Sequence, residues 1–386
     1  MPDGDSQPQP FVPHTDPTVI DDLRARLRAT RWPDESDGFG WSLGTDVGYL
    51  RELVDYWADE FDWSAAESDI AKLPHFLVPL GGLSIHAIHV TSRSTEPAVP
   101  LLLTHGWPDS FWRYLKVIPL LTDPAAHGAD PADAFDVVVP DLPGFGYSQI
   151  PSGAPLDTRA VAGRWAELMS AFGYDRFVAA GGDMGSHVSR FLALDHPDRV
   201  TAVHRMDAGL PRFAGDPAEL TPAERAWMAD AQRWGAVEGA YAAMQSTKPQ
   251  TAAVGLTDSP AGLAAWIVEK LRAWSDCDGD VERAFTKDEI LTLVTQYWVT
   301  GTIGSSMRTY SANAVLPVEQ YARRVEVPSG FSIFGGDVVR PPREWLDRVA
   351  NTVYVAEPER GGHFAPFEQP ELYADELRKF FRPFRS

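Results

Sequence analysis

Residues 178–197 read VAAGGDMGSHVSRFLALDHP, and this segment is the strongest indication of the fold. It starts as a short apolar run of small side chains, passes through Gly181, Gly182 and Asp183, and continues with apolar residues at helical spacing. A strand pattern, a glycine-flanked turn and a helix pattern in direct succession predict a strand-turn-helix unit with Asp183 at the turn. The small neighbours indicate that backbone segments approach one another closely there.

An Asp at such a turn has two interpretations. In a nucleophile elbow, a reactive side chain stands on a strained strand-to-helix turn above the sheet, and small neighbours such as Gly185 keep other side chains out of its path. Alternatively, Asp183 only caps the helix that follows. The turn by itself leaves both interpretations open.

Two later segments favour the reactive interpretation. FGGD (334–337) places Asp337 directly after a predicted strand, and ERGGHFAPFEQP (359–370) places His363 in a glycine-flanked loop before the last predicted helix. In the α/β-hydrolase fold the chain order is nucleophile, acid and then His. Asp183, Asp337 and His363 follow this order, although singly Asp337 could be a turn residue and His363 a loop histidine.

The segment LLLTHGWPDSFW (101–112) runs from a predicted strand into a candidate oxyanion loop at His105 to Pro108. The backbone N–H of Trp107, together with that of Met184 directly after the elbow, could stabilise a developing oxyanion. The alternative is a proline turn with a packed Trp107.

Asp rather than Ser at position 183 points to a particular kind of reaction. A carboxylate is already ionised near neutral pH and needs no base to activate it. Attack on a saturated carbon gives an alkyl ester that water can later cleave, whereas a Ser would be left as an unreactive ether. The elbow therefore predicts substitution at an sp³ carbon.

The rest of the chain predicts how these motifs are arranged. Strand and helix patterns alternate around the elbow, which indicates a mostly parallel central sheet flanked by helices, as in the α/β-hydrolase fold. Residues 208–320 break the alternation with Ala- and Trp-rich helical periodicity and predict a helical lid. We expect four units: an N-terminal extension (1–82), a first core part (83–207), the lid, and a second core part (321–386). The predicted strands are 83–90, 100–106, 136–142, 176–183, 200–206, 330–336 and 351–357, and the predicted helices include 18–30, 45–59, 157–172, 185–195, 342–349 and 370–381.

Composition excludes several classes of partner. The 386 residues carry a formal net charge of −20, which would repel nucleic acid and anionic membranes and favours a neutral small-molecule substrate. The sequence contains no run of about 18 apolar residues, and its start lacks the basic and apolar regions of a signal peptide. The single cysteine, Cys277, leaves no internal disulfide and argues against a thiolate metal site. We expect a cytoplasmic protein without metal or organic cofactor.

Together, GGDMGS (181–186), HGWPDSFW (105–112) and GGHFAPFEQP (361–370) resemble the microsomal-type epoxide hydrolases, α/β-hydrolases with an N-terminal extension. The resemblance covers nearly the whole chain. It implies conversion of an epoxide to a vicinal diol through an ester on Asp183, which water activated by His363 and Asp337 then cleaves, and it implies a homodimer. The chain departs in two respects, because Asp337 stands where vertebrate members carry Glu and their membrane anchor has no counterpart here.

Two segments of the predicted lid, GAYAAMQSTKP (239–249) and YWVTGTIGSSMRTY (297–310), look like those that supply the family's epoxide-polarising tyrosines. On this match Tyr241 and Tyr310 hold the epoxide oxygen, and a protonated phenol can donate to it as the C–O bond opens. Tyr297 is the rival candidate for the role of Tyr310. If Tyr310 has that role, we expect Tyr297 to bind the substrate together with Trp107. The alternative is that these tyrosines only pack.

Two other functions stay open at this point. A haloalkane dehalogenase also uses an Asp elbow, but that class typically has Trp directly after the nucleophile, where Met184 stands here. A catalytically silent binding protein of the same fold is the other alternative, although every expected catalytic position is filled.

The 13 Trp residues indicate a bulky or aromatic epoxide. The resembling family includes detoxifying enzymes and, in actinomycetes, enzymes that tailor antibiotics such as enediynes; the 28 Arg against six Lys, a bias typical of GC-rich genomes, leaves both roles open.

Overall fold

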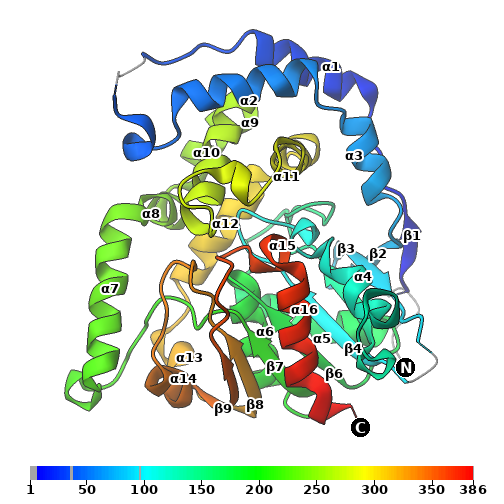
Figure 1. Cartoon of the computed structure of the whole chain (residues 1–386), viewed down its shortest axis with the longest axis vertical. Coiled ribbons are helices and arrows are strands. Elements are labelled where there is room, and N and C mark those ends of the chain that lie inside the picture. The colour runs from blue at the N-terminus through cyan, green and yellow to red at the C-terminus, as the bar shows by residue number, and fades with distance from the viewer. Residues whose placement is uncertain (1–6, 35–37, 95–96, 386) are drawn as a thin grey trace.

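The described residues form one nine-stranded sheet with helices packed around it (Figure 1). The computed structural model describes residues 7–34, 38–94 and 97–385. The strand order is β1-β2-β3-β5-β4-β6-β7-β8-β9; neighbours from β5 to β9 are parallel, and β1, β2 and β3 extend one edge antiparallel. The strands are β1 (Gln9–Phe11), β2 (His75–Leu80), β3 (Leu83–Val90), β4 (Val99–Thr104), β5 (Phe135–Pro140), β6 (Phe177–Gly181), β7 (Val200–Arg205), β8 (Val325–Ser332) and β9 (Ala350–Ala356). The mostly parallel sheet predicted from the sequence is confirmed.

The strand that carries the elbow lies in the middle of the sheet. β6 is buried at all of its positions, which explains why its sequence is a continuous apolar run rather than an alternating one. Its last residues are small because α6 packs closely on its end. A Cβ on Gly181 would lie 2.5 Å from the carbonyl carbon of Gly185. The helices packed around the core strands include α4 (Val117–Thr122), α5 (Thr158–Ala171), α6 (Met184–Asp195), α14 (Arg343–Val349), α15 (Ala365–Glu368) and α16 (Pro370–Phe381).

One strand differs clearly from its predicted bounds. β8 begins at Val325 and ends at Ser332, whereas the sequence predicts residues 330–336. Pro328 and Gly330 are residues that usually interrupt a strand. Here the pairing of β8 with β9 shifts register between Val325 and Pro328, so the proline is accommodated at an irregularity. The strands β1 and β2, the latter with a proline of its own, were not predicted.

Seven α-helices and two short 3₁₀ helices fill residues 217–322, and residues 208–324 contain no strand. We call residues 208–322 the helical segment. The α-helices are α7 (Pro222–Glu238), α8 (Ala240–Thr247), α9 (Pro249–Asp258), α10 (Pro260–Trp274), α11 (Lys287–Thr300), α12 (Ile303–Ala314) and α13 (Val318–Ala322). Helices α9 to α12 lie between the sheet and the N-terminal helices, whereas α7 runs alongside the sheet and α13 lies next to α14 (Figure 1).

The N-terminal helices α1 (Pro17–Arg28), α2 (Val47–Asp59) and α3 (Trp63–Ile70) arch over the helical segment (Figure 1). Hydrogen bonds join the two parts: the Thr45 hydroxyl donates to the carbonyl oxygen of Ala265 at 2.7 Å, and the Tyr56 hydroxyl donates to Asp288 at 2.9 Å. Part of the expected extension, residues 1–6 and 35–37, lies outside the described residues.

The close approach at the elbow generates a stability prediction. A Cβ on Gly185 would lie 1.8 Å from the carbonyl oxygen of Thr104, and a backbone atom cannot move aside cheaply. We expect Gly185→Ala to lower the free energy of unfolding by about 3 kcal/mol or more. Gly163→Ala in α5 is the matched control, because a Cβ there meets nothing within 4 Å and should stabilise the helix by up to about 1 kcal/mol. Urea unfolding of both variants measures this, and equal stabilities would contradict the close packing.

Candidate active site

Asp183 occupies the turn between β6 and α6 in a strained backbone conformation. Its φ is 56° and its ψ is −126°. A non-glycine residue with positive φ costs on the order of 1–3 kcal/mol and persists only where its surroundings hold it. Here the N–H of Asp183 donates to Oδ2 of Asp207 at 2.8 Å, and the N–H of Gly185 donates to the carbonyl oxygen of Gly182 at 2.9 Å. The turn is therefore fixed on both sides of Asp183.

Two backbone donors from different segments hold one carboxylate oxygen of Asp183. Oδ1 accepts hydrogen bonds from the N–H of Trp107 at 2.9 Å and from the N–H of Met184 at 2.7 Å. Gly106 permits this approach, because a Cβ there would lie 2.2 Å from Oδ1. The contact with Met184 fits a helix cap, but the contact with Trp107 reaches across from the loop after β4. Capping alone does not account for it.

The other carboxylate oxygen faces His363. Nε2 of His363 lies 3.4 Å from Oδ2 of Asp183, an ion-pair contact longer than a well-formed hydrogen bond. Nδ1 of the same ring lies 2.8 Å from Oδ1 of Asp337. An isolated parallel bridge between Gly336 and Gly362 sets the two loops side by side. Asp183, His363 and Asp337 therefore form a row, with the imidazole in the middle.

Charge is concentrated in this row. Burial by itself would raise the pKa of Asp183, but His363 and the backbone donors outweigh it and lower the pKa to about 2. Burial also opposes a charge on His363, yet Asp337 and Asp183 together raise the pKa of the imidazole to about 10. At neutral pH the free site consequently holds an imidazolium between two carboxylates.

Tyr241 of α8 and Tyr310 of α12 line the same cavity as Asp183. Their rings form an edge-to-face pair with centroids 5.9 Å apart. Burial raises the pKa of both phenols above the ordinary value, and the charge of Asp183 adds to the shift in each. Both hydroxyls are therefore protonated at neutral pH and can act as hydrogen-bond donors.

The structure does not bring Tyr297 to this cavity. Its hydroxyl donates to the carbonyl oxygen of Asp109 at 2.8 Å, and its side chain is buried. The indole of Trp107 also stays outside the lining residues: it stacks on Tyr241 with centroids 5.4 Å apart and meets Tyr310 edge-on at 5.9 Å. Of the two rival tyrosines, Tyr310 is the one beside Asp183.

A cavity of about 210 Å³ opens over the row of charged residues. Its wall combines the helical segment with the loops after β6, β7 and β8. Aromatic rings supply much of the surface, and a few polar groups are interspersed. The lining residues include Trp234, Tyr241, Trp274, Tyr310 and Tyr321, with Ser246, Asn313 and Arg212 among the polar ones. The cavity therefore fits a mainly apolar ligand with one or two polar groups.

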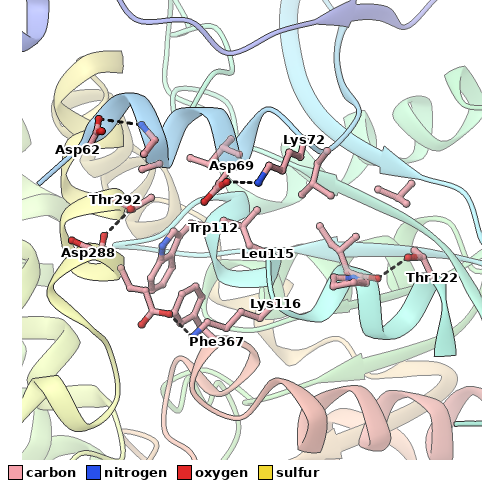
Figure 2. Close-up of a pocket in the computed structure, with 18 of the residues that line it drawn as sticks. Asp62, Asp69, Lys72, Trp112, Leu115, Lys116, Thr122, Asp288, Thr292 and Phe367 are labelled. Carbon is pink, nitrogen blue, oxygen red and sulfur yellow. Dashed lines mark hydrogen bonds and ion pairs between the residues drawn. The ribbon is translucent and has the colours of Figure 1, made fainter. Parts of the chain in front are cut away.

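A larger hollow of about 780 Å³ lies elsewhere, among α3, α4 and α11 (Figure 2). Its two lysines are paired, Lys72 with Asp69 and Lys116 with Glu289. It is lined by none of the predicted catalytic residues. We place the active site in the smaller cavity, because only there do a carboxylate, an imidazole and two phenols converge.

Sequence reasoning missed one carboxylate of the site. Asp207 follows β7 and lines the cavity, and its Oδ1 accepts the N–H of Gly209 at 2.8 Å while Oδ2 holds the N–H of Asp183. Burial, with a smaller effect of Asp337, raises the pKa of Asp207 to about 6. The signal was available in HRMD (204–207), where an Asp directly follows a predicted strand in the same way as Asp337 does in FGGD.

Within the described ranges, no cluster of three or more His, Cys, Asp or Glu side chains is arranged to hold a metal ion. In the same part of the chain, every helix is too short or too polar to cross a membrane.

The fold and the row of Asp183, His363 and Asp337 define an α/β hydrolase with an aspartate at the elbow. Comparison with known families agrees: residues 99–243 match the "alpha/beta hydrolase fold" family and residues 8–114 match "Epoxide hydrolase N terminus". The second match overlaps the expected N-terminal extension and continues through the Trp107 loop.

Full-length relatives give the family. A protein of Stigmatella aurantiaca is 41% identical over 98% of this chain and 85% of its own length. Epoxide hydrolase 1 of Sus scrofa is 35% identical over 97% of this chain and 89% of its own. The structure of Aspergillus niger epoxide hydrolase superimposes with a TM-score of 0.86 at 29% identity, covering 98% of this chain and 97% of that one. The chain belongs to the microsomal-type epoxide hydrolase family.

The raised pKa of Asp207 generates a pH-dependence prediction. A carboxyl group whose pKa is raised by folding contributes stability that is complete below its ordinary pKa of 3.8 and is lost as the pH rises through about 6. Asp207→Asn removes this contribution. The free energy of unfolding of the natural protein, relative to that of the variant, should therefore fall between about pH 4 and pH 7. Urea unfolding across that range measures it, and a difference that does not vary with pH would contradict the raised pKa.

Proposed function

We propose that the protein hydrolyses an epoxide to a vicinal diol, with Asp183 as covalent nucleophile, His363 as general base and Asp337 as the residue that orients it. One observation carries the proposal: the two oxygens of the Asp183 carboxylate have different surroundings. Oδ1 is bound by the N–H groups of Trp107 and Met184, whereas Oδ2 has only the contact with His363 and faces the cavity.

In the first half of the reaction, Oδ2 of Asp183 attacks one epoxide carbon and the C–O bond to the epoxide oxygen breaks. Tyr241 and Tyr310 hold that oxygen, and a phenol proton neutralises the developing alkoxide. The product is a hydroxyalkyl ester on the enzyme. Its carbonyl oxygen is Oδ1, which already lies between the two backbone donors.

The proton balance follows from the charges in the site. Formation of the ester removes the negative charge of Asp183, which is one of the two charges that hold a proton on His363. The pKa of the imidazole then falls, and its proton is free to replace the one that the phenol gave to the alkoxide. His363 is left neutral, as a general base must be.

In the second half, neutral His363 takes a proton from water, and the hydroxide attacks the ester carbonyl carbon. The negative charge that develops on Oδ1 is stabilised by the N–H groups of Trp107 and Met184, which need no rearrangement. Collapse of this intermediate breaks the ester C–O bond, and the departing alkoxide takes the remaining proton of the added water, so that the diol is released and the Asp183 carboxylate is restored beside protonated His363. The cycle adds one water to one epoxide and requires no cofactor.

The cavity supports a substrate of bulky or aromatic character. Its wall contains two indole and three phenol rings, which favour contact with a flat apolar group, and Ser246 and Asn313 offer polar contacts beside them. We take the helical segment as the lid that encloses this substrate. A marked preference for large aromatic epoxides over small aliphatic ones would favour a role in natural-product biosynthesis over general detoxification. The homodimer and the cytoplasmic location stay predictions.

A haloalkane dehalogenase and a silent binding protein fit the site less well. Met184, at the position after the nucleophile, offers no indole N–H to a halide, and the two tyrosines beside Asp183 would have no role in halide release. A binding protein would not need the costly conformation of Asp183 or the row of buried charges.

The ester intermediate can be trapped. His363→Gln should still form the ester on Asp183 but cleave it roughly 100- to 10,000-fold more slowly. After incubation with styrene oxide, mass spectrometry should show a protein heavier by one styrene oxide, with the addition on the peptide that contains residue 183. Asp183→Asn is the control and should show neither adduct nor steady turnover. Undiminished turnover by either variant would refute the scheme.

The choice between the two rival tyrosines can be tested with a matched pair of variants. Tyr310→Phe removes a donor from the epoxide oxygen and should lower kcat for styrene oxide roughly 100-fold. Tyr297→Phe removes a hydroxyl that donates to the Asp109 carbonyl, so it should cost about 1–3 kcal/mol of stability while kcat stays within about threefold. Kinetics and urea unfolding of both variants decide, and the opposite pattern would assign the role to Tyr297.

A further inference from the structure

A small second cavity lies next to the active site, on the other side of His187. Its volume is about 20 Å³, and it shares His187, Arg212 and Tyr321 with the wall of the active-site cavity. Two further arginines, Arg190 of α6 and Arg205 at the end of β7, also line it. We call His187, Arg190 and Arg205 the basic cluster. The mechanism proposed above uses none of the three.

Arg205 is the central member of the basic cluster. It is 1% exposed, and its Nε donates to the hydroxyl of Ser186 at 3.0 Å. Both of its terminal nitrogens, Nη1 and Nη2, are buried and have no hydrogen-bond partner among the described residues. Four N–H bonds of one buried guanidinium are therefore left without an acceptor, which is costly unless a further group supplies it.

The other two members repeat this pattern. Arg190 is 4% exposed, and its Nη2 donates to the carbonyl oxygens of Gln320, Tyr321 and Arg323, whereas its Nη1 has no partner. Nδ1 of His187 is buried without a partner as well. Each member of the cluster thus has at least one nitrogen that makes no bond within the described part of the chain.

The charges of the cluster are also unbalanced. Among the described residues, neither Arg190 nor Arg205 has a carboxylate within ion-pair distance. Asp207 attracts Arg205, but no hydrogen bond joins the two side chains among the described residues, and the Asp207 oxygens accept backbone N–H groups instead. Burial and the neighbouring guanidinium lower the pKa of Arg190 to about 9, and burial lowers that of Arg205 to about 10. Two cations are therefore buried side by side.

We propose that the basic cluster binds a small inorganic anion of the size of chloride in the 20 Å³ cavity. An anion would accept hydrogen bonds from the free N–H groups of Arg190 and Arg205. It would also balance their positive charges, which a neutral water molecule cannot do. The volume is close to that of one water-sized sphere, so it suits a monatomic ion better than phosphate or a substrate carboxylate with its attached chain.

The position of the site gives the anion an influence on the elbow. Nε of Arg205 holds the hydroxyl of Ser186, which in turn donates to the carbonyl oxygen of Asp207 at 2.7 Å. The carboxylate of Asp207 accepts the N–H of Asp183. An anion that fixes Arg205 would thus stabilise the residues that hold the strained turn, whatever reaction the turn serves.

The first test compares thermal unfolding of the full chain in sodium chloride and in sodium gluconate at the same ionic strength. Gluconate is too large for the cavity, and equal ionic strength removes the general screening of a protein with net charge −20. We expect the Tm in chloride to rise by roughly 2 to 4 °C as chloride is increased well above its Kd. Equal Tm values in the two salts at all concentrations would overturn the proposal.

Variants place the effect at the basic cluster. Arg205→Met removes one buried charge, so its Tm should not respond to chloride, and in gluconate it should melt at or above the temperature of the natural protein. Arg233→Met, at an exposed arginine paired with Asp230, is the matched control and should keep the full chloride response. A chloride response that survives in Arg205→Met would overturn the proposed location.

A structural measurement keeps the test decisive even if Arg205→Met does not fold. Crystals of the natural protein grown in sodium bromide should show an anomalous peak within hydrogen-bond distance of the terminal nitrogens of Arg190 and Arg205. Bromide elsewhere but only water in this cavity would overturn the proposal. Bromide that binds in crystals without any Tm response to halide would mean binding at crystal concentration only and would equally overturn it.

Discussion

The active site depends on one constraint: Asp183 must hold a positive φ while its carboxylate lies between two backbone donors. The conformation costs on the order of 1–3 kcal/mol, and several hydrogen bonds offset it together. Asp207 binds the N–H of Asp183, and Trp107 and Met184 bind Oδ1. Because all three bonds end on one residue, its backbone and one carboxylate oxygen are fixed at once. The second carboxylate oxygen, Oδ2, accepts no backbone N–H from the described residues and faces His363.

Segments far apart in the sequence fix the position of His363. Its backbone N–H donates to the carbonyl oxygen of Trp274, the last residue of α10, at 2.7 Å. Its backbone carbonyl oxygen accepts a hydrogen bond from the buried guanidinium of Arg113 at 2.7 Å. The same helix α10 accepts the hydrogen bond of Thr45 from the N-terminal part of the chain. The N-terminal part of the chain therefore acts on the site without lining it, because it holds the helix to which the backbone of His363 is hydrogen-bonded.

The sequence predicted those parts of the site whose signal is local. An elbow and an Asp or His that follows a given strand are read from neighbouring residues, so Asp183, Asp337 and His363 were found in their chain order. The direction in which a helical side chain points depends on how whole helices pack, which neighbouring residues in the sequence do not reveal. Only the coordinates therefore show that Tyr310, and not Tyr297, lies beside Asp183. The start of β8 was missed because its proline and glycine are tolerated only through irregular pairing with β9. Asp207 also had a local signal, because it directly follows a predicted strand. It was missed because only one catalytic acid was sought, and Asp337 filled that position.

Two carboxylates, those of Asp183 and Asp207, line the same cavity. The cations around them are placed differently: His363 lies on the substrate side, whereas Arg205 lies behind the turn beside Ser186. The carboxylate of Asp207 accepts the N–H groups of Asp183 and Gly209, and no hydrogen bond joins it to Arg205 among the described residues. The buried guanidinium of Arg205 therefore keeps two terminal nitrogens that bond to no described residue. A small anion at the basic cluster would accept these donors, and the Asp207 carboxylate would stay on the N–H of Asp183.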